Sequence, residues 1–144
     1  MQHDKEAKMK NIPKDSWNMI QQVIRRYPEN KEIYDNKIEE LTQGSPSQDG
    51  QPRGNYPTNR LEEIAIKLDT PYMQRMRREI KAVEDAYSQL REDYKKIIRI
   101  RFWSDRYKNM PYMWMTRCVS YSERQIRRVC KAFVREVGEN LGEL

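Results

Sequence analysis

The side chains best suited to binding or catalysis lie in the last 25 or so residues of the chain. Four basic residues recur there at three- and four-residue steps, which places them on one side of an α-helix: Arg124, Arg128, Lys131 and Arg135. The opposite side is apolar and carries Ile126, Val129, Cys130, Phe133, Val134 and Val137. No acid faces Arg124 or Arg128 within the helix, and the Glu partners that would neutralise a surface helix at i+4 are lacking. Such a face suits the phosphates and base edges of a nucleic acid.

A basic helix face is often only solvated, and the distribution of charge along the chain weakens that alternative. Residues 1–42 hold eight basic and eight acidic side chains, and residues 43–90 hold seven of each. Residues 91–144 hold thirteen basic against seven acidic side chains, so the whole net charge of +6 belongs to the last third. This asymmetry indicates a negatively charged partner.

No constellation typical of an enzyme is present, and we expect no catalytic activity. His3 is the only histidine and precedes every predicted helix, and no glycine-rich phosphate loop occurs. Cys118 and Cys130 fall on apolar helix faces, where a small buried side chain is the expected role. The acidic pairs at 39–40 and 62–63 lie on amphipathic helices without a third ligand. We therefore expect neither a cofactor nor a metal ion.

The elements that position the basic face are predicted to be helical. Few glycines and almost no alternating β-branched runs favour an all-α fold. Residues 120–122 form a tight corner before the last helix, with Ser122 as N-cap and Glu123 in the first turn. Before the corner, Pro111 starts a helix over 112–119. Its inward-facing residues are Met115, Cys118 and Val119.

A second basic helix is predicted over 90–102, followed by a polar loop over 104–109. Its apolar stripe consists of Leu90, Tyr94, Ile97, Ile98 and Phe102, and its other sides carry Lys95, Lys96, Arg99 and Arg101. Five aromatic residues gather around this loop and the corner: Trp103, Tyr107, Tyr112, Trp114 and Tyr121. Stacking on single-stranded bases is one use for them, but in a core short of Leu we expect wedges between helices.

A heptad seam precedes this region. Thr70 and Pro71 suit the N-cap and the first helical position, respectively. Apolar residues then alternate at three- and four-residue steps: Met73, Met76, Ile80, Val83, Tyr87, Leu90, Tyr94 and Ile97. The seam fits a long helix that packs on the N-terminal helices, or a coiled coil between two copies. Periodicity leaves open whether one helix or two span 71–102, and a break would fall within 88–93.

The sequence predicts two helices and a linker in the first part of the chain. Pro13 opens a helix with apolar Trp17, Ile20, Ile24 and Tyr27. We expect Pro28 to interrupt it and a second helix to follow over 29–42. Residues 43–57 hold three of the five glycines and three of the seven prolines, as a mobile linker does. Asn59 and Glu62 then have the form of a capping box. The helix that begins there carries Leu61, Ile64, Ala65 and Leu68 on one side.

These elements divide the chain into four parts. We expect an N-terminal helical region at 1–42, a flexible linker at 43–57, a short helix plus a long heptad helix at 58–89, and a helix-turn-helix domain at 90–144. No run of 18 apolar residues and no apolar leader occurs, so we expect a cytoplasmic protein that does not enter a membrane.

The segment from Leu90 to Glu143 resembles the helix-turn-helix of sigma-70 region 4. The similarity is clearest at 122–129, where Ser-Glu-Arg-Gln-Ile-Arg-Arg-Val is similar to that family's recognition helix. With helices and a polar linker before it, the chain resembles the RinA and ArpU families of late transcriptional regulators from temperate phages. The resemblance implies a DNA-binding activator of late phage genes such as packaging functions. Met115 and Thr116, with Trp114 beside them, depart from the small pair usual in the first helix.

The same resemblance implies roles for individual residues. The last helix would enter the major groove of double-stranded DNA, with Ser122 and the helix N-terminus on a phosphate. The residues placed for bases are Arg124, Gln125 and Arg128. The further phosphate contacts are Arg127, Lys131, Arg117, Arg106 and Lys108. We expect a homodimer or a higher oligomer.

Two other functions fit the same pattern. The basic module could dock on RNA polymerase, as region 4 does, with DNA contacts secondary. A small terminase-like packaging subunit also combines a helix-turn-helix with an oligomerisation helix, although its DNA-binding part usually comes first in the chain and here comes last. The salt dependence of binding distinguishes polymerase docking from DNA binding. The mass in solution distinguishes a dimer from the large rings of a packaging subunit.

Overall fold

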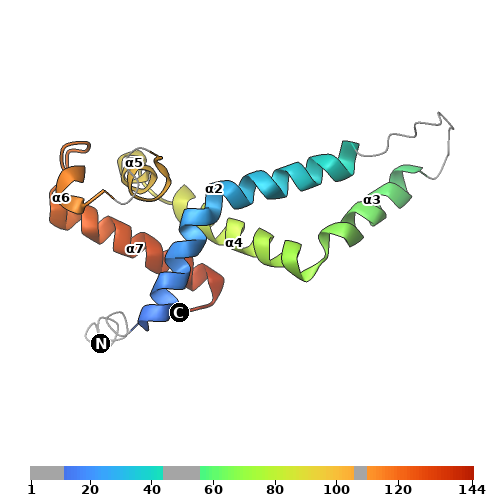
Figure 1. The fold of residues 1–144 in the computed structure, drawn as a ribbon, viewed down its shortest axis with the longest axis horizontal. Helices are drawn as coiled ribbons and strands as arrows, with labels where there is room; N and C mark the ends of the chain where they lie inside the picture. The colour runs from blue at the N-terminus through green and yellow to red at the C-terminus, as the bar shows by residue number, and fades with distance from the viewer. Residues whose placement is uncertain (1–11, 44–55, 106–109) are drawn as a thin grey trace.

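The computed structural model describes residues 12–43, 56–105 and 110–144, and every regular element in those ranges is helical. The elements are α2 (Lys14–Gln43), α3 (Tyr56–Leu68), α4 (Pro71–Ser88), α5 (Glu92–Ile98), the π-helical segment η1 (Arg99–Trp103), α6 (Tyr112–Met115) and α7 (Glu123–Leu141). The expected all-α class is confirmed for the described residues. The molecule is elongated, with α5 and α6 toward one end and α3 at the other (Figure 1).

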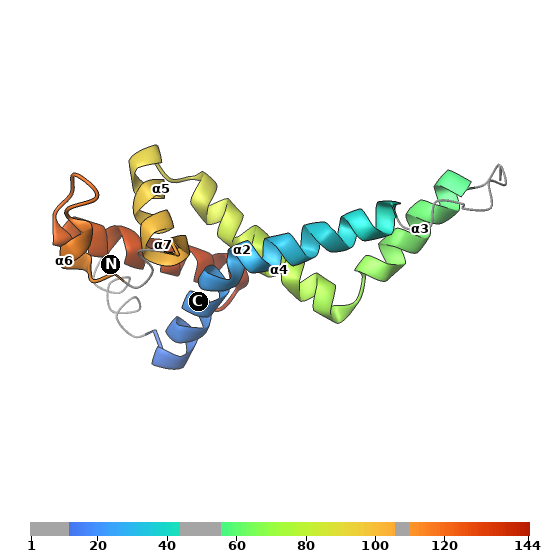
Figure 2. The same cartoon turned by 45° about the horizontal axis from the view of Figure 1, so that its top comes forward.

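One apolar core joins the N-terminal helix to the C-terminal region. Its buried side chains come from α2, α4, α5, η1, α6 and α7. Helix α4 packs against both α2 and α7, and α2 crosses α7 (Figure 2). At this crossing a Cβ on Gly138 would lie 2.6 Å from Cδ1 of Ile20 and 2.8 Å from Cδ1 of Leu144. Glycine therefore permits the close contact of the two helices.

Helix α2 continues through Pro28 and bends midway along its length (Figure 1), so the expected interruption at Pro28 is wrong. Proline has no amide hydrogen and leaves the carbonyl four residues earlier without its helical donor. The indole Nε1–H of Trp103 donates to that carbonyl, Ile24 O, at 2.7 Å. The Trp103 ring also packs edge-on against Tyr27 and Tyr87, with 5.3 Å between centroids in each pair. A side chain of η1 thus supplies the donor that Pro28 lacks.

The heptad seam is divided between two helices. Helix α4 starts as predicted, because the Thr70 hydroxyl accepts from the Met73 amide at 3.2 Å and Pro71 follows the cap. It ends at Ser88, and α5 begins at Glu92, within the range where a break was expected. Four of the five seam residues of α4 are at most 5% exposed, namely Met73, Met76, Ile80 and Val83, and the fifth, Tyr87, is half-buried. Their apolar surface is covered within this chain.

The predicted helix 90–102 also differs from the structure. Its regular α-helix is the shorter α5, and the chain then continues as the π-helical η1 to Trp103. The apolar stripe was nevertheless predicted correctly, since Ile97 and Ile98 are fully buried and Phe102 is 2% exposed. The wider π-helical turn changes the direction of the side chains after Ile98. Trp103 thereby reaches α2.

Helix α3 starts earlier than predicted. It begins at Tyr56 and not at Asn59, which places Pro57 in the first turn, where a missing amide hydrogen costs nothing. The expected linker 43–57 overlaps the last residue of α2 and the first residues of α3, and positions 44–55 lie outside the described residues.

The expected apolar side of α3 is not buried. Leu61 is 67% exposed and Ala65 is exposed as well, whereas Ile64 and Leu68 are half-buried. Ile66, which was not assigned to the stripe, is 72% exposed. Helix α3 packs on α2 at the end of the molecule farthest from α6, so it is distant from the main core (Figure 2).

Candidate nucleic-acid interface

Side chains of α5 fix the corner before α7. The Ser122 hydroxyl accepts from the Gln125 amide at 3.2 Å, as predicted for the N-cap. The Tyr121 hydroxyl donates to the carboxylate of Asp93, and its ring lies edge-on to Tyr94 at 5.6 Å between centroids. The side chain of Gln125 donates to the Tyr94 hydroxyl at 2.9 Å. These contacts hold the first turn of α7 against α5.

The hydrogen bond between Tyr121 and Asp93 also changes the acidity of both groups. Donation by Tyr121 is the main reason that the pKa of Asp93 lies below its ordinary value, and Arg91 lowers that pKa further. The same bond raises the pKa of Tyr121. At neutral pH Asp93 is therefore a carboxylate anion and Tyr121 is its neutral hydrogen-bond donor.

Helix α7 buries the apolar side that its sequence predicts. All six residues are 5% exposed or less: Ile126, Val129, Cys130, Phe133, Val134 and Val137. Burial raises the pKa of the Cys130 thiol to about 12, although the nearby charge of Arg101 opposes the shift. This thiol stays protonated at neutral pH. Helix α7 ends at Leu141 and is capped by Gly142, whose φ of 79° is the left-handed conformation that glycine adopts most readily.

The opposite side of α7 presents positive charge to solvent. Arg124, Arg128 and Lys131 are exposed, and none of them makes an ion pair with another described residue. Arg135, the fourth residue of this side, is half-buried, and its Nε has no hydrogen-bond acceptor. We call the three exposed residues the basic row.

Two polar residues that flank the row are engaged within the protein. Arg127 donates to Glu123 at 2.9 Å, so this flanking residue has the i,i+4 acidic partner that the basic row lacks. Glu123 is favourable in the first turn for a second reason, because it meets the positive end of the helix dipole. Gln125 uses one N–H of its side chain for Tyr94 and keeps its amide oxygen and the other N–H.

The first helix of the predicted helix-turn-helix is shorter than expected. The range 112–119 was predicted as a helix, but α6 is a single turn, Tyr112–Met115, and 116–119 continue as turns. The Thr116 hydroxyl donates to the Met113 carbonyl at 2.6 Å, and the Cys118 amide donates to Met115 O at 2.9 Å. A hydroxyl that bonds to a nearby carbonyl competes with the regular helical pattern. Met115 faces inward as predicted and is fully buried.

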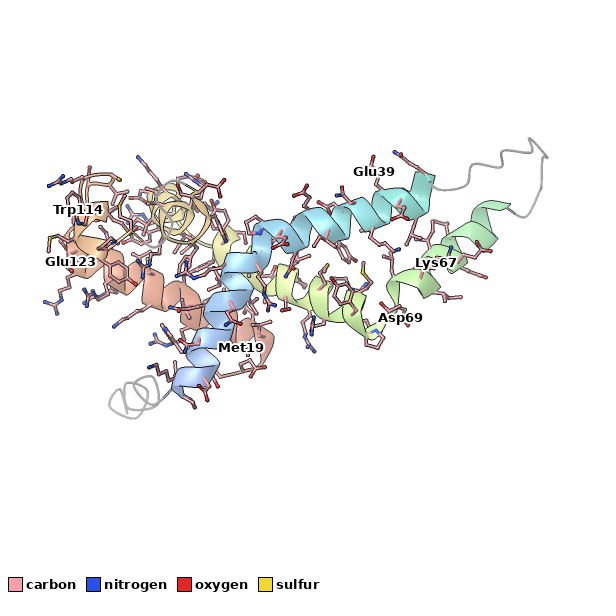
Figure 3. The ribbon with its side chains drawn as sticks, in the orientation of Figure 1. Met19, Glu39, Lys67, Asp69, Trp114 and Glu123 are labelled. Atoms are coloured by element: carbon pink, nitrogen blue, oxygen red, sulfur yellow. The ribbon has the colours of Figure 1, made fainter. Side chains whose placement is uncertain are left out.

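Trp114 differs from the expected wedge between helices. Its side chain is 49% exposed, and the Arg117 guanidinium stacks on the indole with 4.2 Å from Cζ to the ring centroid. Figure 3 shows Trp114 and Glu123 together at the end of the molecule where α6 and α7 meet. Arg117 is exposed at this end, whereas Arg106 and Lys108 lie outside the described residues.

Another group of basic side chains lies beside α7, and two of its three members were not among the contacts predicted from the sequence. The guanidinium carbons of Arg101 and Arg127 lie 4.3 Å and 5.1 Å from the ring centroid of Tyr112. Arg25 of α2 lies over the ring of Phe102 at 5.3 Å. We call Arg25, Arg101 and Arg127 the arginine cluster. No spacing in the sequence connects α2 with η1 and α7, so no local signal identifies it.

No protein-family model matches the sequence, and comparisons with curated proteins and with solved structures gave no significant match either. Within 12–43, 56–105 and 110–144, no helix combines the length and apolar character needed to cross a bilayer. The same ranges contain no group of three or more His, Cys, Asp or Glu side chains arranged for a metal ion.

Proposed function

We propose that the protein is a sequence-specific regulator of transcription that binds double-stranded DNA, with α7 as its recognition helix. The observation that carries the proposal is the basic row, which is exposed and unpaired on a helix whose opposite side is buried. The major groove admits one α-helix and presents acceptors that arginine can bind in pairs. The contacts of α5 with the corner support the proposal, because a recognition helix must be held firmly against the rest of its domain.

The available hydrogen-bonding groups suggest a role for each residue. Arg124, Gln125 and Arg128 lie in the first half of α7, the part that meets base edges in helix-turn-helix proteins. Gln125 keeps an acceptor and a donor for a base despite its bond to Tyr94. Ser122 accepts from the backbone and can donate its hydroxyl hydrogen to a phosphate. We assign Lys131, Arg127 and Arg117 to phosphates.

The narrower proposal, an activator of late phage genes, rests on the resemblance of residues 90–143 to sigma-70 region 4 and of the chain to the RinA and ArpU families. Docking on RNA polymerase remains the second candidate on the same resemblance. Duplex binding that falls steeply with salt favours DNA contact. Capture of polymerase that persists at high salt favours docking.

The first experiment selects bound sites from random duplexes and titrates the selected site against random DNA at fixed salt. Arg128→Ala should reduce discrimination between the two by about 1–3 kcal/mol, the usual contribution of a bidentate guanine contact. Lys131→Ala should weaken binding to both equally. Arg77→Ala, which removes an exposed charge from α4, is the matched control.

The proposal is contradicted if the unsubstituted chain binds no duplex, or if the two α7 variants behave like the control. The selected sites also report on oligomeric state. An inverted repeat with half-sites one helical turn apart indicates a homodimer, because the symmetry of the site follows that of the protein.

A further inference from the structure

We infer that the arginine cluster holds a backbone phosphate of the bound DNA, which makes helix α2 part of the DNA-binding surface. The inference rests on the proposed function and extends it to Arg25 and Arg101, which lie outside the predicted contacts. It also gives the N-terminal helix a direct part in binding.

The cluster is assembled from three elements that are distant in the sequence. Arg25 comes from α2, Arg101 from η1 and Arg127 from α7, and the aromatic rings of Phe102 and Tyr112 support them. A guanidinium that lies over a ring keeps its in-plane N–H groups available for an anion. The rings thus orient the three cations without neutralising them, and only Arg127 also has an acidic partner, Glu123 at 2.9 Å.

The cluster contains more donors than acceptors. Among the described residues, neither Arg25 nor Arg101 makes an ion pair. Arg101 donates through Nη1 to the Met110 carbonyl at 2.7 Å, while its Nε and Nη1 of Arg25 are buried without an acceptor, so a phosphate would meet the remaining N–H groups of Arg25. By contrast, the neighbouring Arg26 pairs with Glu79 at 3.4 Å. A phosphodiester brings the negatively charged acceptor oxygens that Arg25 and Arg101 lack.

The electrostatics of Arg25 agree with this geometry. Burial lowers its pKa most, and the positive charge of Arg101 lowers it further. Two like charges therefore face each other without a carboxylate between them, which disfavours the free protein. A bound phosphate would relieve that repulsion, so the cluster is better matched to a complex with an anion than to the free state.

The position of the cluster suits a contact with the DNA backbone. Arg127 belongs to the cluster and lies one residue before Arg128 of the basic row. A recognition helix in the major groove has phosphates on both sides of it, and contacts to them set its orientation. The cluster occupies the side of α7 that faces η1 and α6.

The test compares Arg25→Gln with the Arg77→Gln control in duplex titrations over a series of salt concentrations. Loss of one phosphate contact reduces the magnitude of the log–log salt slope by about 0.9, which corresponds to about eight-fold weaker binding at 0.1 M salt. Selected and random duplexes should be affected equally, because a phosphate contact carries no sequence information. The control should change neither the slope nor the affinity by this amount.

Thermal unfolding separates a binding role from a structural one. Arg25→Gln removes the repulsion from Arg101 and the contact with the Phe102 ring, two effects of opposite sign, and no hydrogen bond, so the melting temperature should change little. Weaker DNA binding together with unchanged or higher stability supports the inference. A lower melting temperature with the salt slope of the unsubstituted chain, or binding indistinguishable from that of the control, overturns it.

Failure of the proposed function gives a different result. If the unsubstituted chain binds no duplex, the DNA contact falls with the proposed function. Titration with inorganic phosphate at constant ionic strength then decides whether the cluster binds anions at all. A melting temperature that rises with phosphate in the unsubstituted chain, but not in Arg25→Gln, keeps the cluster as a phosphate site, and equal behaviour of the two excludes it.

Discussion

Replacing Trp103 by Phe should lower the free energy of unfolding, because it leaves the carbonyl that Pro28 cannot serve without a donor. The substitution removes the only described donor to Ile24 O while keeping a ring between Tyr27 and Tyr87. A buried carbonyl without a partner costs about 1–3 kcal/mol, and the lower half of that range applies because Trp103 is only half-buried. The smaller ring loses about 1 kcal/mol of apolar burial. We expect the free energy of unfolding to fall by about 2–3 kcal/mol in total.

A double-mutant cycle with Pro28→Ala isolates the hydrogen bond. Alanine at position 28 restores an amide hydrogen that can donate to Ile24 O, as in a regular helix. In that background Trp103→Phe should lose only the apolar contribution. The coupling between the two positions is therefore expected to be about 1–2 kcal/mol.

Denaturation by urea, with an unchanged dependence on denaturant, gives the four free energies of the cycle. Trp114→Phe is the control, since this exposed tryptophan should change stability by less than about 0.5 kcal/mol. Strict additivity of Trp103→Phe and Pro28→Ala, within about 0.5 kcal/mol, would refute the assignment of Trp103 as the replacement donor.

Three further predictions follow from the core and the corner. Gly138→Ala should lower the free energy of unfolding by up to about 2 kcal/mol in thermal melts, because its Cβ would crowd Cδ1 of the buried Ile20 while alanine regains about 1 kcal/mol of helix propensity. Under native conditions an alkylating reagent should modify the half-buried Cys118 before the buried Cys130, as measured by mass spectrometry. The pKa of Asp93 is lowered on folding, so its bond with Tyr121 stabilises the protein above the ordinary value of 3.8, and this stabilisation is lost as the pH falls through the lower folded value. In Tyr121→Phe, the free energy of unfolding should therefore fall less steeply as the pH is lowered below 3.8.

The sequence allowed α7 to be predicted almost completely. Its buried side, its Ser122 cap and its exposed basic row all depend on spacings within a single helix. The same reasoning placed the break before α5 correctly. It could not decide that two helices were present, because Tyr87 and Tyr94 pack on one core even though the backbone turns between them.

The features that could not be predicted depend on contacts between distant segments. Pro28 was expected to end a helix because nothing local can replace its missing hydrogen, and the replacement comes from Trp103. The arginine cluster likewise combines Arg25 with residues of η1 and α7. Spacing rules describe residues that are close along the chain and carry no information about contacts between distant segments.

The hydrogen bond from Trp103 to Ile24 also has a consequence for the order in which the protein forms. It joins residues 79 positions apart, so α2 leaves the ribosome long before its missing donor has been synthesised. Until then water must solvate the carbonyl, and the bend of α2 has no fixed angle. Contacts of such long sequence separation form late and slowly. We therefore expect α2 and α7 to reach their final arrangement together, only after Trp103 has been synthesised, and not one after the other.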